Sequence, residues 1–174
     1  KGKIEFEEKD IYSYSNREYQ EQIAVVPQKF SPPWGTVENY MLKTVRRYPH
    51  IKNSDKRMDE IVRKINISSL LKRKMKSLTP GELRWVVLAA QISADSKVLF
   101  IDEYELHLGK GEIKKLNNLL YRKINYDGIT LITSTQNKDL FKRLASVTIT
   151  LENGRITSLR SFSKKKDKYR NKGK

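Results

Sequence analysis

The sequence predicts an α/β fold with a mostly parallel sheet flanked by helices, and three observations support it. Short apolar runs rich in β-branched residues alternate with segments of helical periodicity. A block of amphipathic helical segments interrupts this alternation between residues 36 and 80. Near the C-terminus, Asn153-Gly154 separates two alternating runs, which is the strongest short-range signal for a hairpin. We therefore expect a parallel core, a helical insert and a C-terminal β-hairpin.

The N-terminal part predicts the start of the core. A short strand is expected over residues 4–6, followed by a short helix with Ser15 as its N-cap and Glu18 three residues later. The apolar run at 23–27 ("IAVVP") has the length and composition of a buried strand. It leads into a loop that begins at Gln28 and contains two prolines and a glycine.

The middle of the chain predicts three helices. The segments 36–48 and 55–65 show helical periodicity, and Asp55 is expected to cap the second of them. A third helix is expected over 82–93, with Trp85 to one side of its core-facing stripe.

The remainder predicts two further strands and two further helices. The strands are expected at 97–102 ("KVLFID") and 128–135 ("GITLITST"), and the helices at 111–125 and 138–145. Strands and helices therefore alternate through this part, as in a parallel α/β core.

Composition limits the classes of function. A chain of 174 residues, 37% of them hydrophobic, can bury one sizeable core. It has no apolar run long enough to cross a bilayer, no signal-peptide core, no cysteine and only two histidines. Disulfides, thiolate metal sites and histidine-rich metal sites are therefore excluded. The net charge of +16 favours an acidic partner such as nucleic acid or a lipid surface.

Polar residues follow three of the expected strands at the point where each strand ends. They are Gln28, Asp102, Glu103 and Gln136. Ligands of parallel sheets bind at the carboxyl ends of the strands, where a carboxylate can hold Mg²⁺ and a neighbour can orient an attacking water. The alternative is structural, with Asp102 capping a following helix and Glu103 solvated. The residues alone leave both interpretations open.

Residues 77–103 resemble the block of ABC-type ATPases that joins the signature helix to the Walker B strand. The turn "LTPGE" at 78–82 stands in place of the LSGGQ-like signature, and "VLFIDE" stands in place of the Walker B strand. Four other stretches resemble, in the correct order, the family's first strand and turn, its Q-loop, its switch strand and its C-terminal hairpin. They are 2–11, 23–42, 127–137 and 147–156. The resemblance implies the ABC type of P-loop NTPase fold.

The resemblance also implies a role for each candidate residue. Asp102 would be the Walker B ligand of Mg²⁺, and Glu103 the general base that orients the attacking water. Gln28 would contact the Mg²⁺ and that water, and Gln136 would replace the switch histidine. The signature turn would bind the γ-phosphate of an ATP held by the opposite subunit, because a helix N-terminus is an anion site. Its members are Leu78, Thr79, Pro80, Gly81 and Glu82.

Several positions depart from the family pattern. No G-x-x-x-x-G-K-[ST] phosphate loop (Walker A) occurs in the 174 residues, and we expect it in a preceding segment rather than in another chain. Pro80 removes one N–H from the signature turn. Tyr104 replaces a proline, and Gly109 replaces an aspartate. Gln136 cannot carry the charge of a histidine. These departures predict a weakened site, which Glu103 keeps from being inactive.

The resemblance implies a subunit of an ABC transporter that binds and hydrolyses ATP with Mg²⁺ and dimerises head to tail with a second ATPase domain. A membrane-spanning permease would be its partner, at the cytoplasmic face of the membrane. Two alternatives stay open: a soluble ABC ATPase acting on the ribosome or nucleic acid, and a non-catalytic half that lends only its signature turn. The expected parts are an incomplete core with the Q-loop, a helical subdomain, the rest of the core and a disordered basic tail. Their bounds are 1–35, 36–80, 81–160 and 161–174.

Overall fold

The computed structural model describes residues 2–141 and 143–162, and it has the predicted α/β architecture with a parallel sheet. The chain divides into two compact units between Gln136 and Asn137. The first unit contains the sheet and the long helices, and the second contains an antiparallel hairpin. No helix in the described ranges combines the length and the apolar character that a bilayer span requires.

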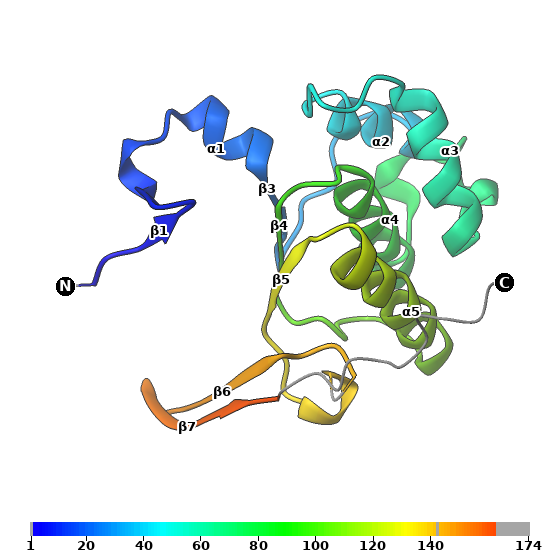
Figure 1. The fold of residues 1–174 in the computed structure, drawn as a ribbon. Coiled ribbons are helices and arrows are strands. Elements are labelled where there is room, and N and C mark those ends of the chain that lie inside the picture. The colour runs from blue at the N-terminus through cyan, green and yellow to red at the C-terminus, as the bar shows by residue number, and fades with distance from the viewer. Residues whose placement is uncertain (1, 142, 163–174) are drawn as a thin grey trace, which may run out of the picture. The chain divides into compact units, whose positions relative to one another are not determined.

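A three-stranded parallel sheet, in the order β3-β4-β5, forms the centre of the first unit (Figure 1). Its strands are β3 (Ile23–Val26), β4 (Val98–Ile101) and β5 (Thr130–Thr133). The register pairs Val26 with Ile101 and Ile101 with Thr133, so the three carboxyl ends lie level with one another. Residues that follow these strands are therefore brought to one edge of the sheet.

One face of this sheet is buried and the other is open. Helices α4 (Pro80–Ser93) and α5 (Lys110–Tyr126) lie on the same side of the strands (Figure 1). On the opposite face, Val25 pairs with Phe100 and Phe100 pairs with Ile132, forming one apolar row. Val25 and Ile132 are each 49% exposed, whereas their neighbours Ala24 and Val26 in β3 are buried.

Helix α4 is the centre of the packing. It contacts β3 on one side and the insert helices α2 (Val37–Val45) and α3 (Ser54–Ile65) on the other. Trp85 is consequently only 5% exposed, and its Nε1 donates to the Ile65 carbonyl at 3.2 Å. The expectation that Trp85 lies beside the core was wrong, because a helix covered on both sides has no free flank.

The N-cap of α3 also differs from the prediction. Asn53, not Asp55, caps the helix, and its Oδ1 accepts a hydrogen bond from the Lys56 N–H at 2.9 Å. The cap must precede the first helical residue, and Asp55 already lies in the first turn. Two 3₁₀ turns, Ser68–Leu70 and Met75–Ser77, lead from α3 to α4.

The N-terminal segment follows the sequence closely. A two-residue antiparallel pair, β1 (Glu5–Phe6) with β2 (Lys9–Asp10), is followed by a 3₁₀ turn at Ile11–Ser13. Helix α1 (Asn16–Gln22) begins with the predicted capping box. Ser15 Oγ accepts from the Glu18 N–H, and the Glu18 carboxylate accepts from the Ser15 N–H.

In the second unit, the predicted hairpin is confirmed. Strands β6 (Val147–Glu152) and β7 (Arg155–Ser161) pair antiparallel around Asn153 and Gly154, whose φ angles of 49° and 75° are those of a two-residue hairpin turn. The helix expected over 138–145 is wrong in type, because the described part is a 3₁₀ helix at Lys138–Phe141. Most of the predicted basic tail, residues 163–174, lies outside the described residues.

Candidate functional site

The acid pair lies at the carboxyl edge of the sheet. Asp102 follows β4, its N–H donates to the Val26 carbonyl at 3.0 Å, and it is exposed. Ser134, which follows β5, donates its hydroxyl to Asp102 Oδ1 at 2.6 Å. The same hydroxyl oxygen accepts the N–H of Glu103 at 2.8 Å. The Ser134 hydroxyl therefore holds the side chain of Asp102 and the backbone N–H of Glu103.

Glu103 occupies a strained position with a free carboxylate. Its φ of 45° lies in the left-handed region, which a non-glycine residue adopts only where its surroundings hold it. Within the described residues its carboxylate accepts no hydrogen bond, and the residue is half-buried. The carboxylate is therefore open to an incoming polar group.

Tyr104 anchors the loop that leaves the acid pair. The residue is fully buried, its N–H donates to the Ser134 carbonyl at 3.1 Å, and its hydroxyl bonds to Asn117 Oδ1 in α5. Burial raises the pKa of the Tyr104 hydroxyl, so this side chain stays neutral. At the position where the resembled family has proline, this chain thus has a buried hydrogen-bonded tether.

Gln136 lies just beyond the same edge and is exposed. Glu105 holds its backbone, because Glu105 Oε1 accepts the Gln136 N–H at 3.2 Å. The Thr135 hydroxyl lies 2.9 Å and 2.8 Å from the two oxygens of the same carboxylate. The third acid of the run Asp102-Glu103-Tyr104-Glu105 therefore orders the residues that follow β5.

The turn at 78–82 is already occupied by its own side chains. Thr79 caps α4, and the Glu82 carboxylate accepts the Thr79 N–H at 2.8 Å and bonds to the Thr79 hydroxyl at 3.0 Å. Arg73 Nη1 holds the other Glu82 oxygen at 2.5 Å. The Thr79 backbone N–H, more than any other contact, lowers the pKa of Glu82. Pro80 has no N–H, and an anion that uses the Thr79 N–H must displace the Glu82 carboxylate.

Gln28 and this turn line the same hollow. A cavity of about 340 Å³ lies between the loop after β3, the start of α4 and the loop before α5. Its lining includes Gln28, Phe30, Leu78, Pro80, Arg84 and His107. A Cβ added to Gly81 would lie 3.0 Å from the His107 carbonyl oxygen, so a larger residue here would require the loop to shift by a few tenths of an ångström.

Arg84 joins the two groups of candidate residues. Its guanidinium donates to the carbonyls of Pro27 at 2.7 Å, Asp102 at 2.5 Å and Glu103 at 2.9 Å. Burial lowers the pKa of Arg84, while the nearby carboxylates of Asp102, Glu103 and Glu105 act in the opposite direction. The guanidinium nevertheless remains charged at neutral pH.

The donors at Asp102 suit an open magnesium site, with few protein ligands, better than a metal site closed by protein side chains. Among the described residues, no three His, Cys, Asp or Glu side chains group as a metal cage. Mg²⁺ is usually held through one or two carboxylates together with waters and substrate phosphates. Asp102 is exposed at the sheet edge, and Ser134 bonds to only one of its oxygens. Asp102 therefore fits such an ion as its single carboxylate.

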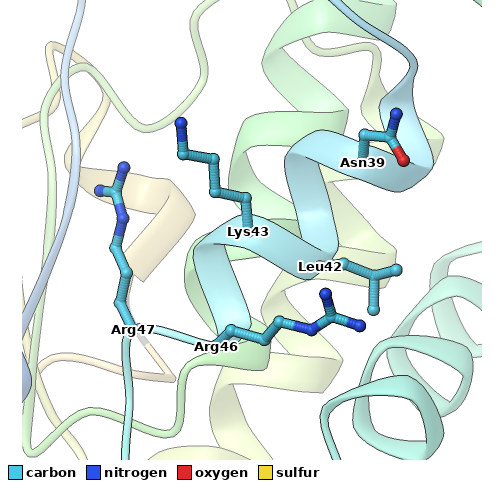
Figure 2. A pocket seen from close by; sticks show the side chains of 5 residues that line it. All are labelled: Asn39, Leu42, Lys43, Arg46 and Arg47. Carbon is cyan, nitrogen blue, oxygen red and sulfur yellow. The ribbon is translucent and has the colours of Figure 1, made fainter.

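A second hollow, of about 400 Å³, lies on α2 and its C-terminal end, and it is basic. It is lined by Asn39, Leu42, Lys43, Arg46 and Arg47 (Figure 2). Lys43 and Arg47 point the same way, and within the described residues neither forms an ion pair. Arg46 has one acidic neighbour, Asp55, at 3.9 Å. None of the described residues that line this hollow is an acid, so it suits an anion and not a metal ion.

The sequence interpretation missed Arg84, Ser134 and Glu105. A charged residue next to the long apolar run of residues 85–90 was a visible signal for Arg84. No comparable signal marks Ser134 or Glu105, because polar residues are ordinary at strand ends. The strand register alone brings Ser134 beside the acid pair.

Comparison with known proteins points to one family. The sequence model described as "ABC transporter" matches residues 1–105, more than half of the chain. The cytochrome c biogenesis ATP-binding export protein CcmA of Rickettsia bellii is 31% identical over 102 residues, which are 58% of this chain and 52% of the relative. The cell division ATP-binding protein FtsE of Streptococcus pneumoniae is 29% identical over 105 residues, which are 60% of this chain and 45% of that protein. The chain thus spans about half the length of these relatives.

Solved structures show the same fold. An ATP-binding subunit of an ABC transporter matches with a TM-score of 0.79 at 17% identity, over 92% of this chain and 67% of that one. A dimeric ATP-binding cassette bound to ADP and Pi matches with a TM-score of 0.79 at 18% identity, over 92% of this chain and 73% of that one.

Proposed function

The chain belongs to the ABC transporter family, and on that premise we propose that it is part of an ATP-binding and ATP-hydrolysing subunit of a transporter complex. The observation that carries the proposal is the sheet edge, where Asp102 and Glu103 lie together beside residues from the two neighbouring strands. ATP would close two such domains head to tail, and hydrolysis would reopen them. The relatives named as ATP-binding proteins of export and cell division support the same class of function.

The acid pair divides the work of hydrolysis between two carboxylates. Asp102, fixed by Ser134, would hold Mg²⁺, and the bound ion would offset the charge of the phosphate oxygens. Glu103 would accept a proton from the attacking water, because its carboxylate accepts no hydrogen bond from the described residues. Gln28 and Gln136, both exposed at this edge, would orient the same water through their amides.

The signature turn would contribute weakly. Thr79 and Gly81 would contact the γ-phosphate of an ATP bound by the opposite domain, with Leu78, Pro80 and Glu82 completing the turn. The Glu82 carboxylate must first leave the Thr79 N–H, and Pro80 offers no donor. Both features support a site that turns over slowly.

Two components of such a transporter would lie outside these 174 residues, the phosphate-binding loop and the permease. No phosphate-cradling loop occurs in the sequence, so another segment or chain would supply it. A membrane-spanning permease subunit would be the partner, with this domain at the cytoplasmic face of the membrane. Within the 174 residues, the proposed divisions are the core at 1–35 and 81–160, the helical subdomain at 36–80 and the basic tail at 161–174.

The direct test is Glu103→Gln in the ATPase assembled with its phosphate loop. We expect ATP turnover to fall at least about 100-fold, because general base catalysis contributes on that scale. ATP binding, measured by filter retention of labelled nucleotide, should persist. Glu8→Gln is the matched control, since Glu8 is an exposed acid remote from the strand ends in sequence. Unchanged turnover in Glu103→Gln would identify a non-catalytic half.

A second candidate function is a soluble ABC ATPase acting on the ribosome or nucleic acid, and the basic hollow on α2 favours it. The side chains of Lys43 and Arg47 line that hollow (Figure 2), and neither forms an ion pair with a residue that the structure describes. Co-purifying RNA that is lost in Lys43→Ala/Arg47→Ala would support this candidate. Lys114→Ala/Lys115→Ala removes the same charge from the exposed side of α5 and is the control.

A further inference from the structure

Arg84 is a buried cation, and none of the acids that the structure describes is buried beside it. Its side chain belongs to α4, and the residue is 5% exposed. All three acceptors of its guanidinium are neutral backbone carbonyls, at 2.5–2.9 Å. Its Nε is buried and makes no hydrogen bond within the described residues. A buried charge of this kind is costly, and an apolar side chain of similar volume would fill the position more cheaply.

The three carbonyls that accept from Arg84 belong to the backbone beside the candidate site residues. The Pro27 carbonyl belongs to the peptide that leads into Gln28. The Asp102 carbonyl belongs to the peptide that joins Asp102 to Glu103, and the Glu103 carbonyl belongs to the next peptide. Arg84 therefore holds the backbone after two neighbouring strands, β3 and β4, without bonding to the carboxylates themselves. The planar guanidinium can reach several acceptors in a fixed fork, which a lysine ammonium cannot.

Arg84 is also rigidly connected to the signature turn. The capping box at Thr79 and Glu82 opens the same helix, and Arg84 follows it within the next turn. Leu83 and Arg84 line the 340 Å³ cavity together with Gln28 and Pro80. A shift of the α4 N-terminus would therefore be transmitted to the loops after β3 and β4 through one side chain.

We infer that Arg84 is a positioning residue that couples the signature turn to the acid pair of the same domain, through its hydrogen bonds to Pro27, Asp102 and Glu103. The inference rests on the proposed function for the roles of Gln28, Asp102 and Glu103. It adds a route by which a contact at the start of α4 controls the geometry of hydrolysis.

The first test measures hydrogen–deuterium exchange in the 174-residue chain, which requires no ATP. Arg84→Met removes the clamp, and Arg84→Lys keeps the charge without the fork. We expect exchange in the segments 27–31 and 102–108 to accelerate at least tenfold in Arg84→Met and less in Arg84→Lys. The segment 116–124 of α5 should keep its protection. Arg122→Met, which removes an exposed arginine of α5, should change none of these segments.

The second test measures kcat and KM for ATP in the assembled ATPase. We expect Arg84→Met to lower kcat at least tenfold while KM changes less than threefold, and Arg84→Lys to recover part of kcat. Unchanged exchange in both loops, unchanged kcat, or global unfolding of both variants would overturn the inference. Failure of the proposed function is distinguishable, because Glu103→Gln would then leave turnover unchanged while the exchange result still reports on the clamp.

Discussion

At the scale of single residues, Glu82 has two competing uses. Its carboxylate closes the capping box of α4 and pairs with Arg73, yet it lies at the turn that we propose contacts a phosphate. The same N–H of Thr79 cannot serve both anions. Local helix stability and ligand binding therefore oppose each other at this residue.

The cap predicts a specific pH dependence. The pKa of Glu82 is lowered in the folded chain, chiefly by the Thr79 N–H, so its stabilisation is present at neutral pH and is lost as the pH falls through that lowered pKa. We expect Glu82→Gln to reduce the free energy of unfolding at pH 7, and the difference from the unmodified chain to vanish in acid. Urea unfolding across the pH range measures this. A difference independent of pH would contradict the capping role, and Glu8→Gln serves as the control.

At the scale of elements, an ionic network ties the helical insert to the core. Arg57 of α3 bonds to Asp95 at 2.6 Å, and Lys123 of α5 pairs with the same carboxylate and with Asp127. Lys123 is 5% exposed, so its ammonium depends on these partners. Asp95 thus joins a helix of the insert to a helix of the core.

Removal of Asp95 should loosen that connection. We expect Asp95→Asn to lower the free energy of unfolding by about 1–3 kcal/mol, because a buried ammonium loses one of its two carboxylates. Denaturant titration measures the loss, and exchange should rise in α3 more than in β4. Asp59→Asn, at an exposed position of the same helix, is the control. Equal stability of the two variants would exclude a structural role for the network.

At the scale of the whole molecule, the open face of the sheet is the principal departure from a closed fold. Parallel sheets are normally covered on both faces, whereas here the row Val25, Phe100 and Ile132 is partly exposed. We expect these 174 residues on their own to bind the dye ANS. Val25→Thr/Ile132→Thr should reduce the fluorescence while circular dichroism stays unchanged, because both substitutions keep the β-branched shape. Undiminished fluorescence would show that the dye binds elsewhere.

The charge distribution is also a property of the whole chain. Residues 36–80 contain twelve lysines and arginines against four acids, so half of the net charge of +16 lies in the insert. Only some of these cations form ion pairs in the described structure, such as Arg57 and Arg73. We therefore expect an acidic partner to be attracted electrostatically to the insert more strongly than to any other described part.

The sequence by itself determined the features that depend on residues close together in the chain, which are the secondary structure, the local caps and turns, and the order of the motifs. Alternating and helical periodicity placed the strands of the sheet and all of the predicted helices except the one over 138–145. The Ser15–Glu18 box and the Asn153-Gly154 turn were visible as local patterns, and the ordered motifs identified the family. These features depend on contacts within a few positions or on the two faces of one element. The Asp55 cap was wrong by two residues, which is the usual precision of an element boundary.

Only the tertiary structure decided which distant groups complete the sheet edge. Arg84 reaches carbonyls 57 and 18 positions away, and Ser134 reaches an acid 32 positions away. Trp85 is buried because helices of the insert cover a flank that the periodicity of α4 left open. Such contacts follow from strand register and helix packing, which no local pattern encodes, because they are fixed only when the whole core closes.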